Sequence, residues 1–289
     1  MSDVYVGLTG LELVSDTIDL GDGVVLQRTN ARFLTPLTLE NPDKTVRLDD
    51  IRPAYWQFRA RLMDITAELK LSSPSELDVA KCIERASIIV FTIRLWCDPS
   101  VTMAVVADRP FGQLTEMRDN DHVRVFPLEF SPRFFALEPA NREQMAEKME
   151  WVQQNWAKVE ALYRQNQEFR VAADALSAGQ FIKNDALALI SLWGALEALF
   201  SPSTSELKFR VSALIAAYLE PPGPARLAKQ KEIGALYDKR SAAAHGKPRH
   251  DTSDLLSTFD LVRSVLLRMV REENVPSKQQ LEELLFGCG

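Results

Sequence analysis

The segment Ala186–Phe200 constrains the fold of this chain more than any other stretch. If it forms a helix, its apolar residues lie on every side of that helix. Only Ser191 and Glu197 interrupt the apolar run. A helix needs about 20 apolar residues to cross a bilayer, and this run is shorter. Asn184 or Asp185 can cap its first turn. A helix that is hydrophobic all round is covered by other helices. We therefore expect a buried central helix inside a helical bundle.

The flanking sequence supplies helices that can cover it. One apolar stripe recurs at steps of three and four residues from Met145 to Tyr163, so a long amphipathic helix is expected from about Asn141. Further helices are expected at 169–176, at 206–219, and from about 225, after the break at 221–224. Residues 139–289 are accordingly predicted to form an all-α helical bundle.

Residues 1–138 show a different pattern. The runs Val4–Leu8 and Leu11–Val14 favour strands, and Asp22-Gly23 lies between two apolar runs, which is the strongest short hairpin signal. Apolar residues at helical spacing predict a helix over 54–69. A second helix is expected from Pro74, after Ser73 as N-cap, to Trp96.

Short strands are then expected at 101–106 and 123–130. His122, beside acids in the polar stretch between them, is interpreted as a solvated turn residue. The amino-terminal part is therefore predicted to be an α+β domain, residues 1–138, with no recognisable catalytic constellation. We expect this domain to have a sensory or regulatory role.

Composition narrows the class of protein. The 289 residues are 46% hydrophobic and 26% charged, which is typical of a soluble globular protein. The start Met1-Ser2-Asp3 lacks a secretory pattern, so a cytoplasmic protein without membrane contact is expected. Cys82, Cys97 and Cys288 and the three histidines show no metal-ligand spacing. Neither a metal nor an organic cofactor is expected.

The charge is unevenly distributed. Residues 201–250 hold nine Lys or Arg and four Asp or Glu, a local charge of +5 in a chain whose net charge is −6. The remainder therefore carries about −11. A basic segment in an acidic protein is consistent with a local anion site, or with an ordinary solvated face.

An arginine and a histidine stand close together near the end of the helix that begins at about 225. Arg240 follows Leu236 by four residues and Ile233 by seven, so it lies along the apolar stripe. His245 is about 140° round the helix from Arg240. A regular helix cannot bring both side chains onto one phosphate. Either the last turn unwinds before Gly246, or two copies of the helix meet.

These residues carry a family resemblance. The run Arg240–Gly246, preceded by Leu236-Tyr237-Asp238, resembles the R-x4-H motif of HEPN domains. Trp193–Leu199 and Phe209–Ile215 resemble the preceding helices of the ApeA-like, abortive-infection-like bacterial branch of that family. The match covers roughly residues 145–286, about half of the chain. No motif is recognised in residues 1–135.

The resemblance implies a helical bundle that forms a homodimer and joins two R-x4-H motifs in one cleft. Many such domains are metal-independent ribonucleases used as toxins or in antiviral defence, and others are inactive dimerisation modules. The expected partners are a second copy, an RNA substrate, and an antitoxin or phage-derived trigger.

Histidine suits proton transfer to and from RNA, and arginine suits the charged phosphorane. Arg240 and His245 are thus the candidate catalytic residues. Ser241 could bind the phosphate or orient the imidazole, and Asp238 could orient the imidazole or balance Lys239 and Arg240. Glu197 could support catalysis, or pair with Arg210 or Arg240 to fix helix packing. In the alternative, Gly246 and His245 form an ordinary helix end and Arg240 is structural.

Overall fold

The computed structural model describes residues 2–34, 62–73, 79–114, 124–129, 131, 133–134, 137, 142–200, 207–247 and 250–287. The chain forms two compact units. The sheet unit comprises Met1–Ile93, Ser100–Ser131 and Pro139–Gln153, and the helical unit comprises Arg94–Pro99, Pro132–Glu138 and Gln154–Gly289. The chain passes between the units more than once, whereas the sequence placed a single boundary after residue 138.

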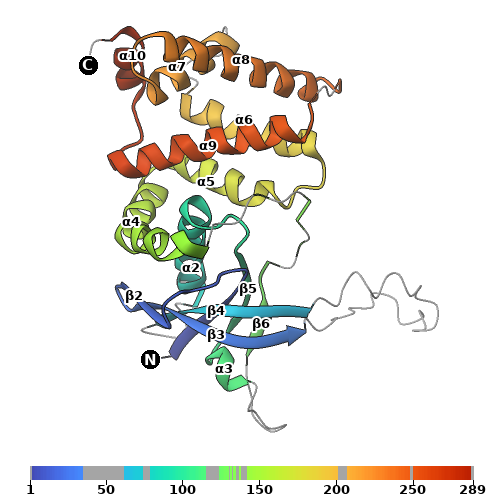
Figure 1. Cartoon of the computed structure of the whole chain (residues 1–289), viewed down its shortest axis with the longest axis vertical. Coiled ribbons are helices and arrows are strands. Elements are labelled where there is room, and N and C mark those ends of the chain that lie inside the picture. Colours follow the sequence, from blue (N-terminus) through green and yellow to red (C-terminus); the bar gives the residue numbers. More distant parts are fainter. Residues whose placement is uncertain are drawn as a thin grey trace, which may run out of the picture. The chain divides into compact units, whose positions relative to one another are not determined.

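The six described strands form one antiparallel sheet in the order β2-β3-β4-β1-β5-β6 (Figure 1). They are β1 Ser2–Thr9, β2 Thr17–Gly21, β3 Val24–Leu34, β4 Leu62–Ser73, β5 Thr102–Ala107 and β6 Val125–Pro127. The amino-terminal strands and those near 101–106 and 123–130 agree with the expected positions. An antiparallel sheet therefore precedes a helical region in this chain.

The predicted hairpin is confirmed. Strands β2 and β3 pair on either side of Asp22-Gly23, whose φ angles are 51° and 74°. Two consecutive left-handed residues match the twist of the flanking strands, which is why Asp-Gly is favoured there. Arg85 fixes the turn further by binding the carboxylate of Asp22 at 3.2 Å.

The strand expected at Leu11–Val14 is wrong. These residues have no regular structure, although Leu11 and Leu13 are buried. Their backbone carbonyls accept hydrogen bonds from side chains and not from a neighbouring strand. Thr66 Oγ1 donates to Leu11 O at 2.7 Å, and Arg28 Nη2 donates to the carbonyls of residues 13 and 14 at 2.9 and 2.8 Å. The apolar residues are therefore buried without a β ladder.

The helix expected at 54–69 is also wrong in its described part. Residues 62–73 form β4, which pairs with β1 and β3. The apolar side chains there also recur every second residue, and those at positions 63, 65, 67, 69 and 71 are all buried. Two periods coexist in this stretch, and the strands on both sides favour the shorter one.

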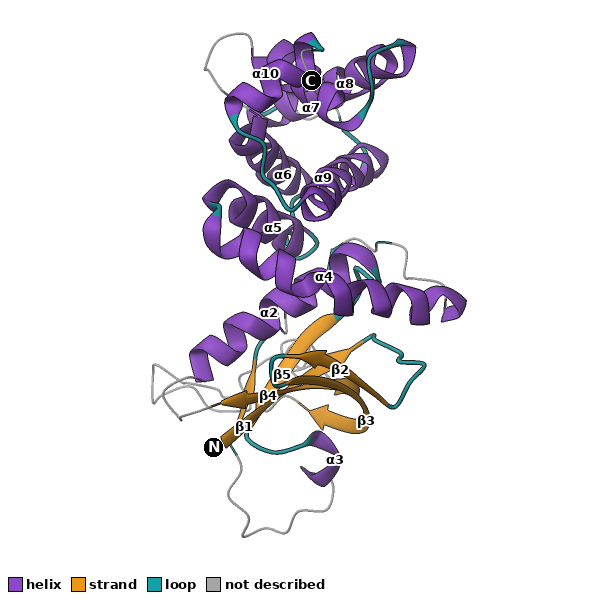
Figure 2. Cartoon of the chain, turned by 90° about the vertical axis from the view of Figure 1, so that its left-hand side faces the viewer, coloured by secondary structure: helices purple, strands orange, loops and turns teal. Residues whose placement is uncertain are grey.

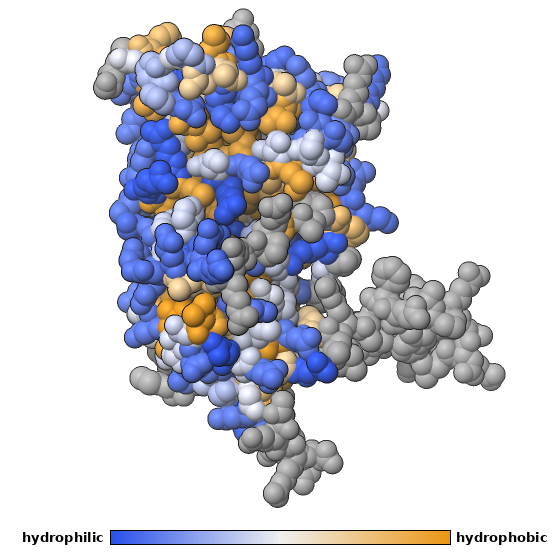
Figure 3. All heavy atoms as spheres, in the orientation of Figure 1, coloured by the Kyte–Doolittle hydropathy of each residue, from blue (hydrophilic) through white to orange (hydrophobic). Residues whose placement is uncertain are grey.

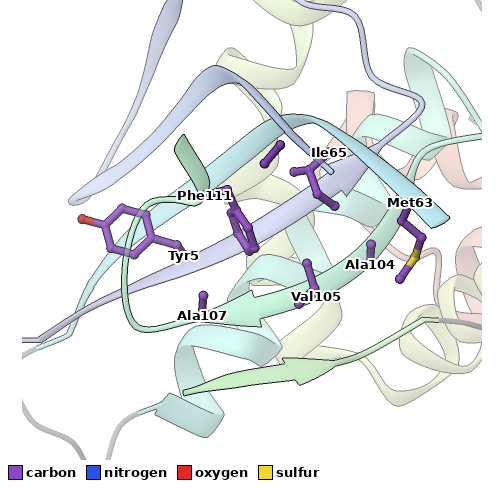
Figure 4. Close-up of a cluster of buried hydrophobic side chains, with 8 residues drawn as sticks. Tyr5, Met63, Ile65, Ala104, Val105, Ala107 and Phe111 are labelled. Atoms are coloured by element: carbon purple, nitrogen blue, oxygen red, sulfur yellow. The ribbon is translucent and has the colours of Figure 1, made fainter. Parts of the chain in front are cut away.

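Figure 2 shows α2, Val79–Trp96, and α3, Phe111–Leu114, on opposite faces of the sheet. Beneath α3, the ring of Phe111 packs among Tyr5, Ile65 and Val105 (Figure 4). A Cβ on Gly7 would lie 2.9 Å from Val105 Cγ1 and 3.0 Å from Phe111 Cζ, so this position has no room for a side chain. Glycine is therefore required where α3 closes over the sheet.

The helices expected between residues 141 and 244 are present in the expected order, and two further helices, Thr252–Glu272 and Lys278–Phe286, were not predicted individually (Figure 1). In chain order, all of these helices are η3 Arg142–Gln144, α4 Met145–Gln165, α5 Gln167–Gly179, α6 Asp185–Phe200, α7 Leu207–Leu219, α8 Pro224–Ala244, α9 Thr252–Glu272 and α10 Lys278–Phe286. Helix α6 contacts α5, α7, α8 and α9, which confirms its central position. It is not covered on every side as predicted, because Leu187, Gly194 and Ala198 form an exposed face. Asn184 is its N-cap, since Asn184 Oδ1 accepts the Leu187 N–H at 3.2 Å.

Some expectations fall outside the described residues. These are the turn role of His122, the first turn predicted at Pro74, and Cys288. Cys82 and Cys97 are buried free thiols. Among the described residues, no helix combines the length and apolar character needed to cross a membrane.

Candidate functional site

Helix α8 carries the R-x4-H motif and ends in a regular cap. His245 is the C-cap residue, and Gly246 follows in the left-handed conformation with φ 68°. Gly246 N–H donates to Ala243 O at 3.1 Å, and Lys247 N–H donates to Ala242 O at 2.9 Å. This pair of bonds is a Schellman motif, which satisfies the last carbonyls of a helix.

The helix remains regular through Ala244, so its last turn does not unwind to bring the motif together. His245 lies five positions after Arg240, which corresponds to about 7.5 Å along the axis and about 140° around it. The two side chains therefore leave α8 in different directions. Within one copy they do not face a common phosphate.

Arg240 points toward α6. Its Nη2 atom donates to Glu197 Oε2 at 3.0 Å, and the side chains are only 22% and 19% exposed. The other carboxylate oxygen, Oε1, accepts the Tyr237 hydroxyl at 3.0 Å. Of the two arginines considered as partners of Glu197, Arg240 is the one that binds it, and Arg210 is exposed on α7. Both oxygens of Glu197 thus hold α8 against α6.

Aromatic rings complete this cluster. The guanidinium of Arg240 lies 5.5 Å from the centroid of the Tyr237 ring, within the range of a cation–π contact. Trp193 of α6 meets the same ring edge-on, at 5.1 Å and 84°. Burial raises the pKa of Tyr237, and the neighbouring Glu197 carboxylate raises it further, while Arg240 opposes the shift. The phenol is therefore kept as a hydrogen-bond donor.

The guanidinium is only partly used. Among the described residues, its contacts are Glu197 and the Tyr237 ring, and its Nε atom is buried without a hydrogen-bond partner. Arginine has five N–H donors in a fixed fork. Because Nε is buried, any donor capacity for another molecule lies in the N–H groups of the two Nη atoms.

His245 is exposed at the end of α8. Its backbone N–H donates to Ser241 O at 3.1 Å, and its imidazole makes no hydrogen bond to any residue that the structure describes. Ser241 is half-buried one turn earlier. The Asp238 carboxylate binds Lys208 Nζ at 2.6 Å, so it does not orient the imidazole here. The expected partners Lys239 and Arg240 pair instead with Asp254 and Glu197.

The structure thus joins two of the five candidate residues, Glu197 and Arg240, and leaves His245, Ser241 and Asp238 outside that cluster. The sequence interpretation missed the polar role of Tyr237, whose hydroxyl binds Glu197. Its position three residues before Arg240 was the available signal, because residues three apart share a helix face. The packing of α6 against α8 then brings Glu197 to both.

The basic segment is less open than its formal charge indicates. Four of its cations form ion pairs, Lys208–Asp238, Lys229–Glu232, Lys239–Asp254 and Arg240–Glu197. Arg226 donates to the carbonyls of Glu220 and Leu284. Within 207–247, as far as the structure describes it, Arg210, Lys231 and Lys247 are exposed and have no ionic or hydrogen-bonded side-chain partner.

The described residues contain no group of three or more His, Cys, Asp or Glu side chains arranged to hold a metal ion. Family models, curated proteins and solved structures were compared with the chain, and none matches it. These comparisons support no family assignment for the chain.

Proposed function

We propose that this protein is a metal-independent endoribonuclease of the HEPN type that acts as a homodimer. The observation that carries the proposal is that α8 presents two different groups. The imidazole of His245 is exposed at the helix end, and the guanidinium of Arg240 is anchored by Glu197 while some of its N–H groups make no hydrogen bond to the described residues. Because the two groups diverge within one copy, His245 of one protomer and Arg240 of its partner form the site.

The chemistry needs no group beyond these side chains. The imidazole of His245 accepts the proton of the RNA 2′-hydroxyl, and O2′ attacks the adjacent phosphorus. The partner's Arg240 stabilises the charged phosphorane. The P–O5′ bond then breaks, and the imidazolium returns its proton to O5′. The products are a 2′,3′-cyclic phosphate and a free 5′-hydroxyl, with no net proton change.

Glu197 and Tyr237 act as positioning residues in this scheme. The carboxylate binds one edge of the guanidinium, and the phenol fixes the carboxylate. Such anchoring favours catalysis because the charged group is already in position, so little free energy is spent on rearranging it during the reaction.

A second candidate function is a catalytically inactive dimerisation module. The Arg240–Glu197 ion pair favours it, because a half-buried pair that fixes two helices needs no further role. The Schellman motif likewise accounts for Gly246 without catalysis.

Cleavage of labelled RNA by the purified full-length chain in EDTA separates the two. The nuclease proposal predicts cleavage by the wild type and its loss in His245→Ala and Arg240→Ala, with the dimeric mass kept in both. Lys231→Ala is the matched control, since it removes an exposed cation from the same helix. Equal cleavage by His245→Ala, or none by the wild type, would overturn the proposal.

A further inference from the structure

The first turn of α7 exposes three consecutive side chains, Lys208, Phe209 and Arg210, whereas residues 211–218 of the same helix are all buried. Phe209 is 64% exposed. A large aromatic ring at the surface of an otherwise buried helix contributes little to the core. It is available to another molecule.

This turn lies beside the motif helix. Lys208 Nζ binds Asp238 of α8 at 2.6 Å, and a Cβ on Gly234 would lie 3.6 Å from Lys208 Cε. Asp238 lies about 200° round α8 from Arg240, and it precedes His245 by seven residues, about 10.5 Å along the axis, on nearly the same side of the helix. The start of α7 is therefore fixed on the side of α8 that carries His245.

Single exposed apolar residues are ordinary on protein surfaces, and Figure 3 shows hydrophobic residues scattered among hydrophilic ones on one face. Phe209 differs from the other large exposed hydrophobic residues of the described chain because a cation stands on each side of it in the sequence. Lys208 is paired with Asp238, but Arg210 has no described ionic partner. Lys247, two residues beyond His245, has none either.

We propose that Phe209 and Arg210 bind single-stranded RNA next to the scissile phosphate, an inference that rests on the ribonuclease function proposed above. A base stacks on the Phe209 ring, and an adjacent phosphate binds the Arg210 guanidinium. Stacking accepts any base, since every base has a π face. This subsite holds unpaired RNA and has little sequence preference.

Fluorescence anisotropy tests the proposal with a fluorescein-labelled single-stranded RNA and the full-length His245→Ala protein, which is expected not to cleave it. Phe209→Ala should weaken binding roughly 5- to 150-fold, the range expected for loss of one base–aromatic stack. Phe209→Tyr should bind like the parent, and Phe209→Leu should bind like Phe209→Ala. Arg210→Ala should weaken binding and reduce the salt slope by about one.

Leu227→Ala is the matched control, because Leu227 is 57% exposed near the far end of α8. It should leave RNA affinity unchanged. Parental affinity in Phe209→Leu would overturn the stacking site. Conversion of the dimer to a monomer by Phe209→Leu, measured by light scattering, would instead make Phe209 a subunit contact.

The outcomes also separate this site from the proposed function. If RNA is bound and cleaved regardless of residue 209, only the stacking site falls. If the parent binds no RNA, both proposals fall.

Discussion

Arg240 and Glu197 join α8 to the central helix through a bond of 3.0 Å between Nη2 and Oε2. The residue that would hold a phosphate is therefore also a packing residue. Its partner cannot be removed without cost to the fold, since an unpaired half-buried charge would remain. Stability and catalysis must be measured separately for every variant of this cluster.

Glu197→Ala should lower the free energy of unfolding by about 2 kcal/mol, because it leaves both Arg240 and the Tyr237 hydroxyl without their acceptor. Asp238→Ala is the control. It breaks a similar ion pair with Lys208, but those side chains are 59% and 52% exposed, so the loss should be about 0.5 kcal/mol or less. Urea denaturation measures both values. Equal losses would contradict a structural role for the buried pair.

Tyr237→Phe should remove about 1 kcal/mol of stability at neutral pH, since one hydrogen bond to Glu197 is lost. The wild type should also lose stability at alkaline pH more steeply than the variant. Burial raises the folded-state pKa of Tyr237 above its ordinary value, so the unfolded chain releases the phenolic proton first. Urea midpoints between about pH 8 and pH 11 test this, and parallel curves would rule it out.

Gly179→Ala should destabilise the helical unit by about 1–3 kcal/mol. A Cβ at this position would lie 2.5 Å from Phe259 Cζ, so α5 and α9 would have to separate. Gly194→Ala, in the exposed face of α6, meets nothing within 4 Å and should stabilise the chain by up to about 1 kcal/mol through helix propensity. Thermal unfolding of the two variants should shift in opposite directions. A stabilising Gly179→Ala would show that the contact is not close.

Glu68 is a buried carboxylate under α3, where Oε2 accepts the Phe111 N–H at 2.7 Å and Oε1 accepts from Gln27. Burial raises its pKa, against the opposing effect of these hydrogen bonds. Its folded form therefore holds a proton more tightly than the unfolded chain, and stability falls as pH rises from the ordinary value of 4.5 through the raised one.

Glu68→Gln removes that titration. The stability of the wild type relative to Glu68→Gln should therefore decline between about pH 4 and pH 7. Urea denaturation of the two proteins at each pH gives the difference. A constant difference would show that the carboxyl group ionises alike in the folded and unfolded chains.

Local patterns predicted much of the fold. The Asp22-Gly23 turn and the helical periods after residue 139 depend on neighbours in the sequence, and the structure has the hairpin and the helices there. Strand β4 could not be told from a helix, because its apolar residues satisfy both periods and only pairing with β1 and β3 decides. The irregular Leu11–Val14 stretch depends on distant donors, Thr66 and Arg28.

The sequence predicted the directions of the candidate side chains on α8 but did not predict which residues pair with one another. Helical geometry placed Arg240 on the apolar face and His245 away from it, as the structure has them. The choice of Arg240 over Arg210 as the partner of Glu197 depends on how α6 packs against α8. The hydrogen bond from the Tyr237 hydroxyl to Glu197 also depends on that packing.

The proposed site joins His245 of one protomer to Arg240 of its partner. Two inactive variants, Arg240→Ala and His245→Ala, are mixed in equal amounts, allowed to exchange subunits, and assayed for RNA cleavage in EDTA. Cleavage should return to about a quarter of the wild-type rate, since half of randomly paired dimers are mixed and each mixed dimer has one intact site of two. A mixture no more active than its separate components, beside an active wild type, would contradict the shared site.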